Sequence, residues 1–199
     1  MEYVCLIVFL LTIIGIILLV VSMVGTANRR KKELSDMKQD FLAKGYQITR
    51  EITHKSPLYG AVATALFDTH NAVLCVLSGK TNQPRYFHFS ELLGFDVIVN
   101  RQTVSGGFGR TVTAGALFGP IGAILASQTG RKEMVDQFEA YIYTNNPNEP
   151  KVEVFKIDKP VRYNTTAFKQ AIQFVEELQA SINTIVEINR SHQQDFIQR

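Results

Sequence analysis

One apolar segment at the start of the chain limits what the rest of it can fold into. From Tyr3 to Asn28 there is no charged residue, and almost every side chain up to Gly25 is aliphatic or aromatic. About 20 helical residues cross the hydrocarbon core of a bilayer, which is roughly 30 Å thick. We therefore expect residues 1–28 to form a transmembrane anchor and the rest of the chain to fold beside a membrane.

A cleaved secretory signal is the alternative for this segment. Glu2 precedes the apolar core and no basic residue does, whereas secretory signals begin with positive charge and have shorter cores. The small residues Gly25-Thr26-Ala27 are what speaks for cleavage. Arg29-Arg30-Lys31-Lys32 follow directly, and basic residues stay on the cytoplasmic side. We predict a single-pass protein of the cell membrane, with its N-terminus outside and its domain in the cytoplasm.

Residues 29–45 are expected to form a basic juxtamembrane helix. Leu34, Met37, Phe41 and Leu42 fall on one helical face, and Gly45 is a plausible stop. Arg29, Arg30, Lys31 and Lys32 either set the topology alone or also contact anionic lipid, at about 1 kcal/mol per residue near the surface. The net charge of +3 is concentrated here, which favours a membrane partner over nucleic acid.

Residues 46–190 are predicted to form one α+β domain. A period of two begins at Tyr46, and seven short antiparallel strands are expected, at 46–53, 61–68, 72–79, 85–90, 95–104, 134–144 and 151–157. Asn164 or Thr165 then caps a long amphipathic helix. Its apolar face is predicted to consist of Phe168, Ile172, Val175, Leu178, Ile182, Ile185 and Val186. Residues 191–199 are expected to be a flexible tail.

Seven such strands closed by a C-terminal helix are the arrangement of a pleckstrin-homology-like domain. FHFSELLGFDVIVN, then GFGRTVTAGALFGPIGAILA, then two further strands, resembles a family of short bacterial and phage pleckstrin-homology-like proteins. These are often joined to SHOCT modules or to a membrane helix, and the similarity covers roughly residues 60–185. No SHOCT-like segment is visible in this chain. The resemblance implies a fold, and it implies no reaction.

A Gly- and Ala-rich stretch, residues 106–132, interrupts the strands and is predicted to be a hydrophobic hairpin folded back at Gly119-Pro120. It is flanked by basic residues, and small residues recur within it at a spacing that allows close helix packing. Three interpretations stay open: a hairpin packed on its own domain, a shallow dip into the cytoplasmic leaflet, or a self-association surface. The membrane-contact candidates are Arg110, Arg131 and Lys132, and the self-association or insertion candidates are Gly115, Gly119, Pro120, Gly122, Ala123 and Ala126.

No pattern in the sequence indicates an enzyme, a cofactor, a metal site or a small-molecule substrate. The histidines are His54, His70, His88 and His192; His70 beside Asp68 has the spacing of a hairpin turn rather than of a metal pair. Phosphoinositide binding would need several basic residues between the first two strands, and HKSPLYG offers Lys55 alone. Cys5 and Cys75 lie in apolar segments and are predicted to be small buried hydrophobes.

Two functional hypotheses remain. The first is a non-enzymatic, membrane-anchored interaction or scaffold protein, envelope- or phage-associated, which binds a membrane protein partner or itself through the Gly-rich stretch. The alternative is a peripheral lipid-binding or membrane-remodelling module that uses the basic residues after the anchor and the same stretch.

Overall fold

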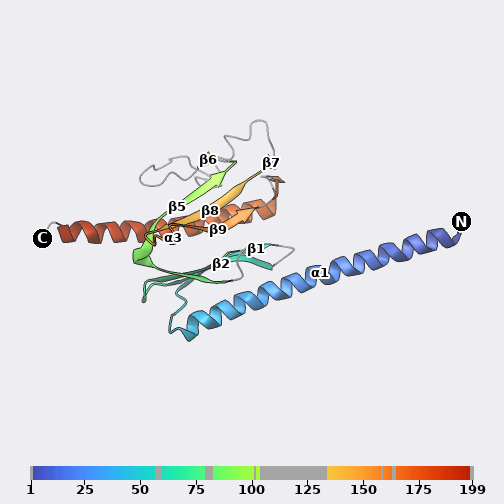
Figure 1. The fold of residues 1–199 in the computed structure, drawn as a ribbon, viewed down its shortest axis with the longest axis horizontal. Helices are drawn as coiled ribbons and strands as arrows, with labels where there is room; N and C mark the ends of the chain where they lie inside the picture. The colour runs from blue at the N-terminus through green and yellow to red at the C-terminus, as the bar shows by residue number, and fades with distance from the viewer. Residues whose placement is uncertain are drawn as a thin grey trace.

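The computed structural model describes residues 2–56, 60–78, 83–100, 102–103, 134–157, 159–162 and 165–197. It has a long apolar N-terminal helix followed by an α+β domain of antiparallel sheets and a C-terminal helix (Figure 1). The helical elements are α1 (Glu2–Ala43), the 3₁₀ turn η1 (Phe89–Glu91) and α3 (Thr166–Ile197). The strands are β1 (Arg50–Ser56), β2 (Gly60–Asp68), β3 (Val73–Leu77), β4 (Arg85–His88), β5 (Leu92–Val99), β6 (Gln102–Thr103), β7 (Met134–Val135), β8 (Phe138–Thr144), β9 (Lys151–Ile157) and β10 (Val161–Arg162).

Helix α1 is one continuous rod, so the expected anchor and the expected juxtamembrane helix are parts of the same element. It is long and apolar enough to cross a membrane. Its end at Gly45 confirms the predicted stop: Gly45 has a φ of +84°, its N–H donates to Leu42 O, and the Tyr46 N–H donates to Phe41 O. This pattern is a Schellman cap, and the Phe41 and Tyr46 rings, 5.1 Å apart, supply the accompanying apolar contact.

The first four predicted strands and the last correspond to β1–β4 and β9. The predicted strand 95–104 is broken into β5 and β6, the predicted strand 134–144 is broken into β7 and β8, and β10 is additional. Sheet A has the order β1-β2-β3-β4, sheet B has the order β6-β5-β8-β9, and β10 pairs with β7. The first ladder begins at Arg50 rather than at Tyr46. The reason is that Tyr46 completes the cap of α1 and the Gln47 N–H donates to the Asp68 carboxylate, at 2.6 Å, instead of entering the sheet.

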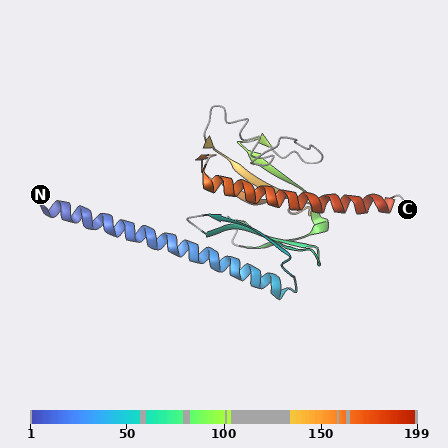
Figure 2. The same cartoon turned by 180° about the vertical axis from the view of Figure 1, so that it is seen from behind.

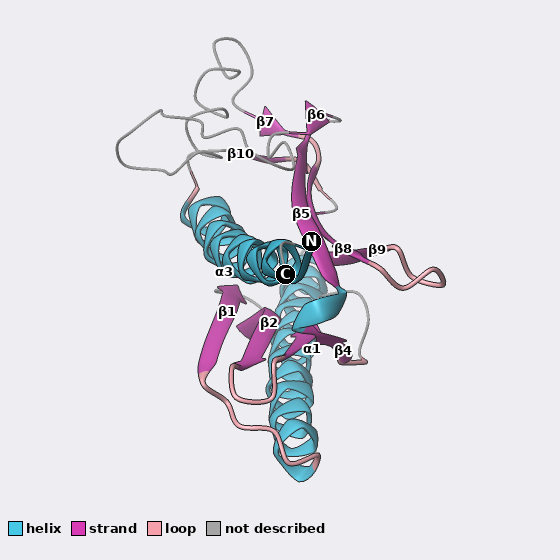
Figure 3. Cartoon of the chain, turned by 90° about the vertical axis from the view of Figure 1, so that its left-hand side faces the viewer, coloured by secondary structure: helices cyan, strands magenta, loops and turns pink. Residues whose placement is uncertain are grey.

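Helix α3 fills the open corner between the two sheets and contacts β1, β5 and η1 (Figure 3). The Thr165 hydroxyl accepts a hydrogen bond from the Phe168 N–H, which confirms the predicted cap. Six residues of the predicted apolar face are buried in the main core, and Ile185 packs against it half-buried. The helix continues to Ile197, so residues 191–197, expected to be a flexible tail, are helical.

Sheet A is covered on both faces. Its inner face packs on α3 and sheet B, whereas Leu66, Val73, Cys75 and Leu77 on the outer face form a second core with residues of α1 (Figure 2). The α1 contribution comes from Met37 and Phe41, both buried, with Leu34 packed beside them. Leu42, predicted for the same face, is 54% exposed. It directly follows Phe41 in the last turn of α1, and successive residues of a helix point about 100° apart.

Candidate functional site: the anchor junction and a groove on α3

Helix α1 is joined to the rest of the domain by polar contacts as well as by the second core. Lys38 Nζ lies 2.7 Å from Glu51 Oε2, and the Tyr86 hydroxyl donates to Asp40 Oδ2 at 2.6 Å. Lys44 stands over the Tyr86 ring, 3.7 Å from its centroid. The hydrogen bond from Tyr86 lowers the pKa of Asp40, whereas burial and the same bond raise the pKa of Tyr86. Burial also raises the pKa of Cys75 to about 12, as expected for a buried, unreactive thiol.

The basic residues after the apolar segment lie at the start of this junction. Arg29 Nε and Arg30 Nη1 each contact Glu33, at 2.9 Å and 3.0 Å, while Lys31 and Lys32 are exposed. From Lys38 back to Arg29, α1 rises about 14 Å. From Glu51 to its end, β1 extends about 17 Å in the same direction (Figure 1). The β1–β2 end of the domain therefore lies about level with Arg29.

Hydrogen bonds join the end of β5 to the segment between β7 and β8. Asn100 Oδ1 accepts from the Asp136 N–H at 2.9 Å and from the Gln137 N–H at 3.3 Å, and β5 pairs with β8 up to Val99 opposite Phe138. Beyond Asn100, β6 folds back along β5, while β7 pairs with β10. The candidates within the Gly-rich stretch lie outside the described residues: Arg110, Gly115, Gly119, Pro120, Gly122, Ala123, Ala126, Arg131 and Lys132.

Asp68 holds the β2–β3 turn together and ties it to the end of α1. Its carboxylate accepts bonds from the His70 N–H, from the Asn71 N–H and side chain, and from the Gln47 N–H. Burial alone would raise the pKa of Asp68, but these donors outweigh it and lower the pKa to about 2. The spacing of Asp68 and His70 is thus the spacing of a turn, as predicted.

His54 is one of the histidines to which the sequence assigned no role. It is buried, its ring meets Phe155 edge-on at 5.1 Å, and its Nδ1 has no hydrogen-bond partner. Burial lowers its pKa, and a hydrogen bond with the Gln170 backbone offsets this only in part. Within the described residues no three His, Cys, Asp or Glu side chains lie close enough together to hold a metal ion.

A second buried carboxylate lies in sheet B and is fully paired. Lys156 Nζ forms an ion pair with Glu139 Oε1 at 2.5 Å, and the Tyr141 hydroxyl donates a hydrogen bond to Glu139 Oε2 at 2.6 Å. Burial alone would raise the pKa of Glu139, but the contacts with Lys156 and Tyr141 outweigh burial and lower this pKa. Burial and the hydrogen bond to Glu139 raise the pKa of Tyr141. These partners make the cluster a link between β8 and β9 rather than a reactive acid.

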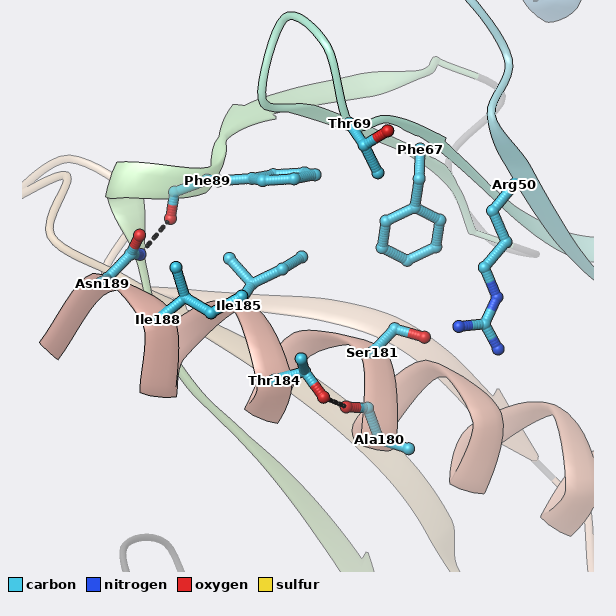
Figure 4. A pocket seen from close by; sticks show the side chains of 10 residues that line it. All are labelled: Arg50, Phe67, Thr69, Phe89, Ala180, Ser181, Thr184, Ile185, Ile188 and Asn189. Carbon is cyan, nitrogen blue, oxygen red and sulfur yellow. Dashed lines mark hydrogen bonds between the residues drawn. The ribbon is translucent and has the colours of Figure 1, made fainter. Parts of the chain in front are cut away.

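A groove lies between α3 and the end of sheet A that carries the β2–β3 turn (Figure 4). Its volume is about 470 Å³. The lining residues are Arg50, Phe67, Thr69, Phe89, Ala180, Ser181, Thr184, Ile185, Ile188 and Asn189. It is lined by η1 and by the C-terminal half of α3, and in Figure 1 these segments lie at the end of the domain away from the N-terminus of α1. Sequence reasoning missed it because its members are brought together by the fold and share no local pattern.

Comparisons of the chain with protein-family models, with curated proteins and with solved structures found no match.

Proposed function

We propose that this chain is a non-enzymatic, membrane-anchored interaction protein that presents a pleckstrin-homology-like domain in the cytoplasm. The observation that supports the proposal is that one helix, α1, contains both the expected membrane anchor and the residues that pack against the domain. The apolar half of the helix leaves its large side chains exposed, from Phe9 to Val24, as contact with lipid requires. The same helix then packs against sheet A without a break. The domain is therefore held at a fixed height and orientation above the bilayer, which suits a scaffold.

The working surface in this proposal is the Gly-rich stretch, residues 106–132, which binds a membrane protein partner or a second copy of the chain. The hydrogen bonds at Asn100 support this, because they hold the end of β5 against the β7–β8 segment, and the stretch lies between these two elements in the sequence. The runner-up is a lipid-binding module that uses Arg29 to Lys32. Lys31 and Lys32 are exposed near the expected head-group level, whereas Arg29 and Arg30 share their charge with Glu33.

Self-association is tested by crosslinking the full chain in membranes. Gly115→Leu with Gly119→Leu should abolish crosslinked oligomers if the stretch is the contact. Gly15→Leu with Gly25→Leu is the matched control, since an added Cβ at either α1 glycine meets nothing within 4 Å. Oligomers that survive the first pair and disappear with the second would move the contact to the anchor.

A protein partner and the topology are tested in cells. Proximity labelling from a tag after Arg199 should enrich a small set of membrane proteins, and this set should shrink with the double leucine variant. A cysteine at exposed Asn148, in the β8–β9 turn, should resist a membrane-impermeant thiol reagent until the cells are lysed. Labelling of intact cells would reverse the proposed orientation.

A further inference from the structure

The residues that line the groove on α3 play no part in the proposed function. We propose that this groove binds a single-chain anionic amphiphile, a long-chain fatty acid or a lysophospholipid, with the anionic head at Arg50 and the chain along α3. The sequence had predicted no small-molecule substrate, and this ligand would be bound rather than converted. The proposal rests on the groove and does not depend on the proposed interaction function. Its test uses the membrane segment of α1 only as an internal standard.

The size of the groove favours a small ligand over a protein. Its volume of about 470 Å³ falls in the range of roughly 300–1,000 Å³ typical of small-molecule sites. Its ten lining residues are fewer than the roughly 20–30 per side of a stable protein interface.

The walls are largely apolar, and three of the polar side chains among them, Ser181, Thr184 and Asn189, are already bonded. In Figure 4 the rings of Phe67 and Phe89 face Ile185 on α3, with Ile188 beside it. The Ser181 hydroxyl donates to Glu177 O at 2.8 Å, and the Thr184 hydroxyl donates to Ala180 O at 2.9 Å. Asn189 donates to Phe89 O at 2.7 Å. A ligand in the middle of the groove therefore needs few hydrogen-bonding groups of its own, and an acyl chain has none.

One end of the groove is cationic. Arg50 is exposed and forms no ion pair with any described residue, whereas its neighbour Glu51 is held by Lys38. Its guanidinium lies beside Ser181 in Figure 4, at the end opposite Asn189. A guanidinium presents a planar fork that matches carboxylate and phosphate oxygens. At the other end Ile188 is 50% exposed, so a chain can extend past it. Because Arg50 is at one end of an apolar groove, the groove fits a ligand with one anionic head group and one apolar chain.

The experiment uses the full chain in nanodiscs of zwitterionic lipid and hexadecanoic acid that carries a photoreactive diazirine at its methyl end. After illumination, labelled peptides are mapped by mass spectrometry. Labelling of α1 reports the bilayer and is the internal standard. We expect additional labelling at residues 180–189 or at Phe89. Unlabelled hexadecanoic acid and lysophosphatidate should remove it, and whichever competes at the lower concentration identifies the preferred head group. Hexadecanol, which has the same chain and no charge, should not compete.

Two variants of the groove and one control variant keep the test decisive. Arg50→Gln should lower groove labelling about tenfold or more relative to α1, the loss expected for one charge-assisted hydrogen bond. Arg162→Gln, which removes an exposed arginine from β10, should leave it unchanged. Thr184→Trp should fill the slot from an exposed position and abolish labelling. Labelling confined to α1, equal competition by hexadecanol, or an Arg50→Gln variant that labels like the parent would each overturn the proposal.

Discussion

Replacing Asp68 with asparagine should destabilise the domain in a way that depends on pH. The carboxylate is fully buried and accepts four hydrogen bonds, and its pKa is lowered from 3.8 to about 2. At 1.36 kcal/mol per pKa unit, the ionised form contributes about 2 kcal/mol to folding at neutral pH. Because the pKa is lower in the folded state, this contribution is present above about pH 4 and is lost as pH falls through about 2.

At pH 7 the Asp68→Asn variant should lose at least about 2 kcal/mol of unfolding free energy. The amide nitrogen that replaces Asp68 Oδ2 cannot accept from the Gln47 N–H or from the Asn71 side-chain amide. The deficit should shrink by about 1 kcal/mol between pH 7 and pH 3. The chain has seven Tyr and no Trp, so denaturant titrations of the full chain in micelles can be followed by near-UV circular dichroism of tyrosine. Asp136→Asn, at an exposed site, is the control. A deficit of the same size at both pH values would refute the electrostatic account.

Three further changes test the junction and the core with the same titrations. Phe41→Ala should cost about 3–5 kcal/mol by emptying the second core, and limited proteolysis should then cut near Gly45 sooner than in the parent. Gly45→Ala should cost about 1 kcal/mol through its positive φ alone, since an added Cβ meets nothing within 4 Å. The pKa of His54 is lowered by burial, so the parent should lose stability as pH falls below about 6.5, and His54→Leu should remove that loss. A parent whose stability is flat between pH 7.5 and pH 5.5 would contradict the last of these.

The elements that could be predicted are those whose burial leaves a period in the sequence. The apolar face of α3 was predicted because one side of that helix packs on the core along most of its length. Strands such as β9 were predicted for the same reason at a period of two. Boundaries failed where a local hydrogen bond replaced the regular one: the Asp68 carboxylate takes the Gln47 N–H, and the first ladder starts later than the alternation suggested.

The covering of sheet A by α1 was missed, although a signal for it exists. All five residues of β3, Val73 to Leu77, are apolar and buried. A strand with one face in water alternates, so an unbroken apolar run indicates a second covering layer. Met37 and Phe41 had been placed on one apolar face of the helix over residues 29–45, and this face could have been matched to the second face of β3. The groove left no comparable trace, because a cation on β1, two rings on sheet A and η1, and one face of α3 have no common spacing.

The two-sided burial of sheet A changes what the anchor does for the domain. If α1 were only a tether, the domain would be complete without it. Instead its last turns supply Met37 and Phe41 to a core whose other members, Leu66 and Cys75, would otherwise face water. Hydrophobic burial scales with area, so removing that part of the helix costs the domain stability as well as location. Sheet A is thus the layer through which α1 on one face and the groove-bearing α3 on the other are held in fixed relation. A partner that displaced α1 from sheet A would expose an apolar face and, under the proposed function, would also release the domain from its position at the membrane.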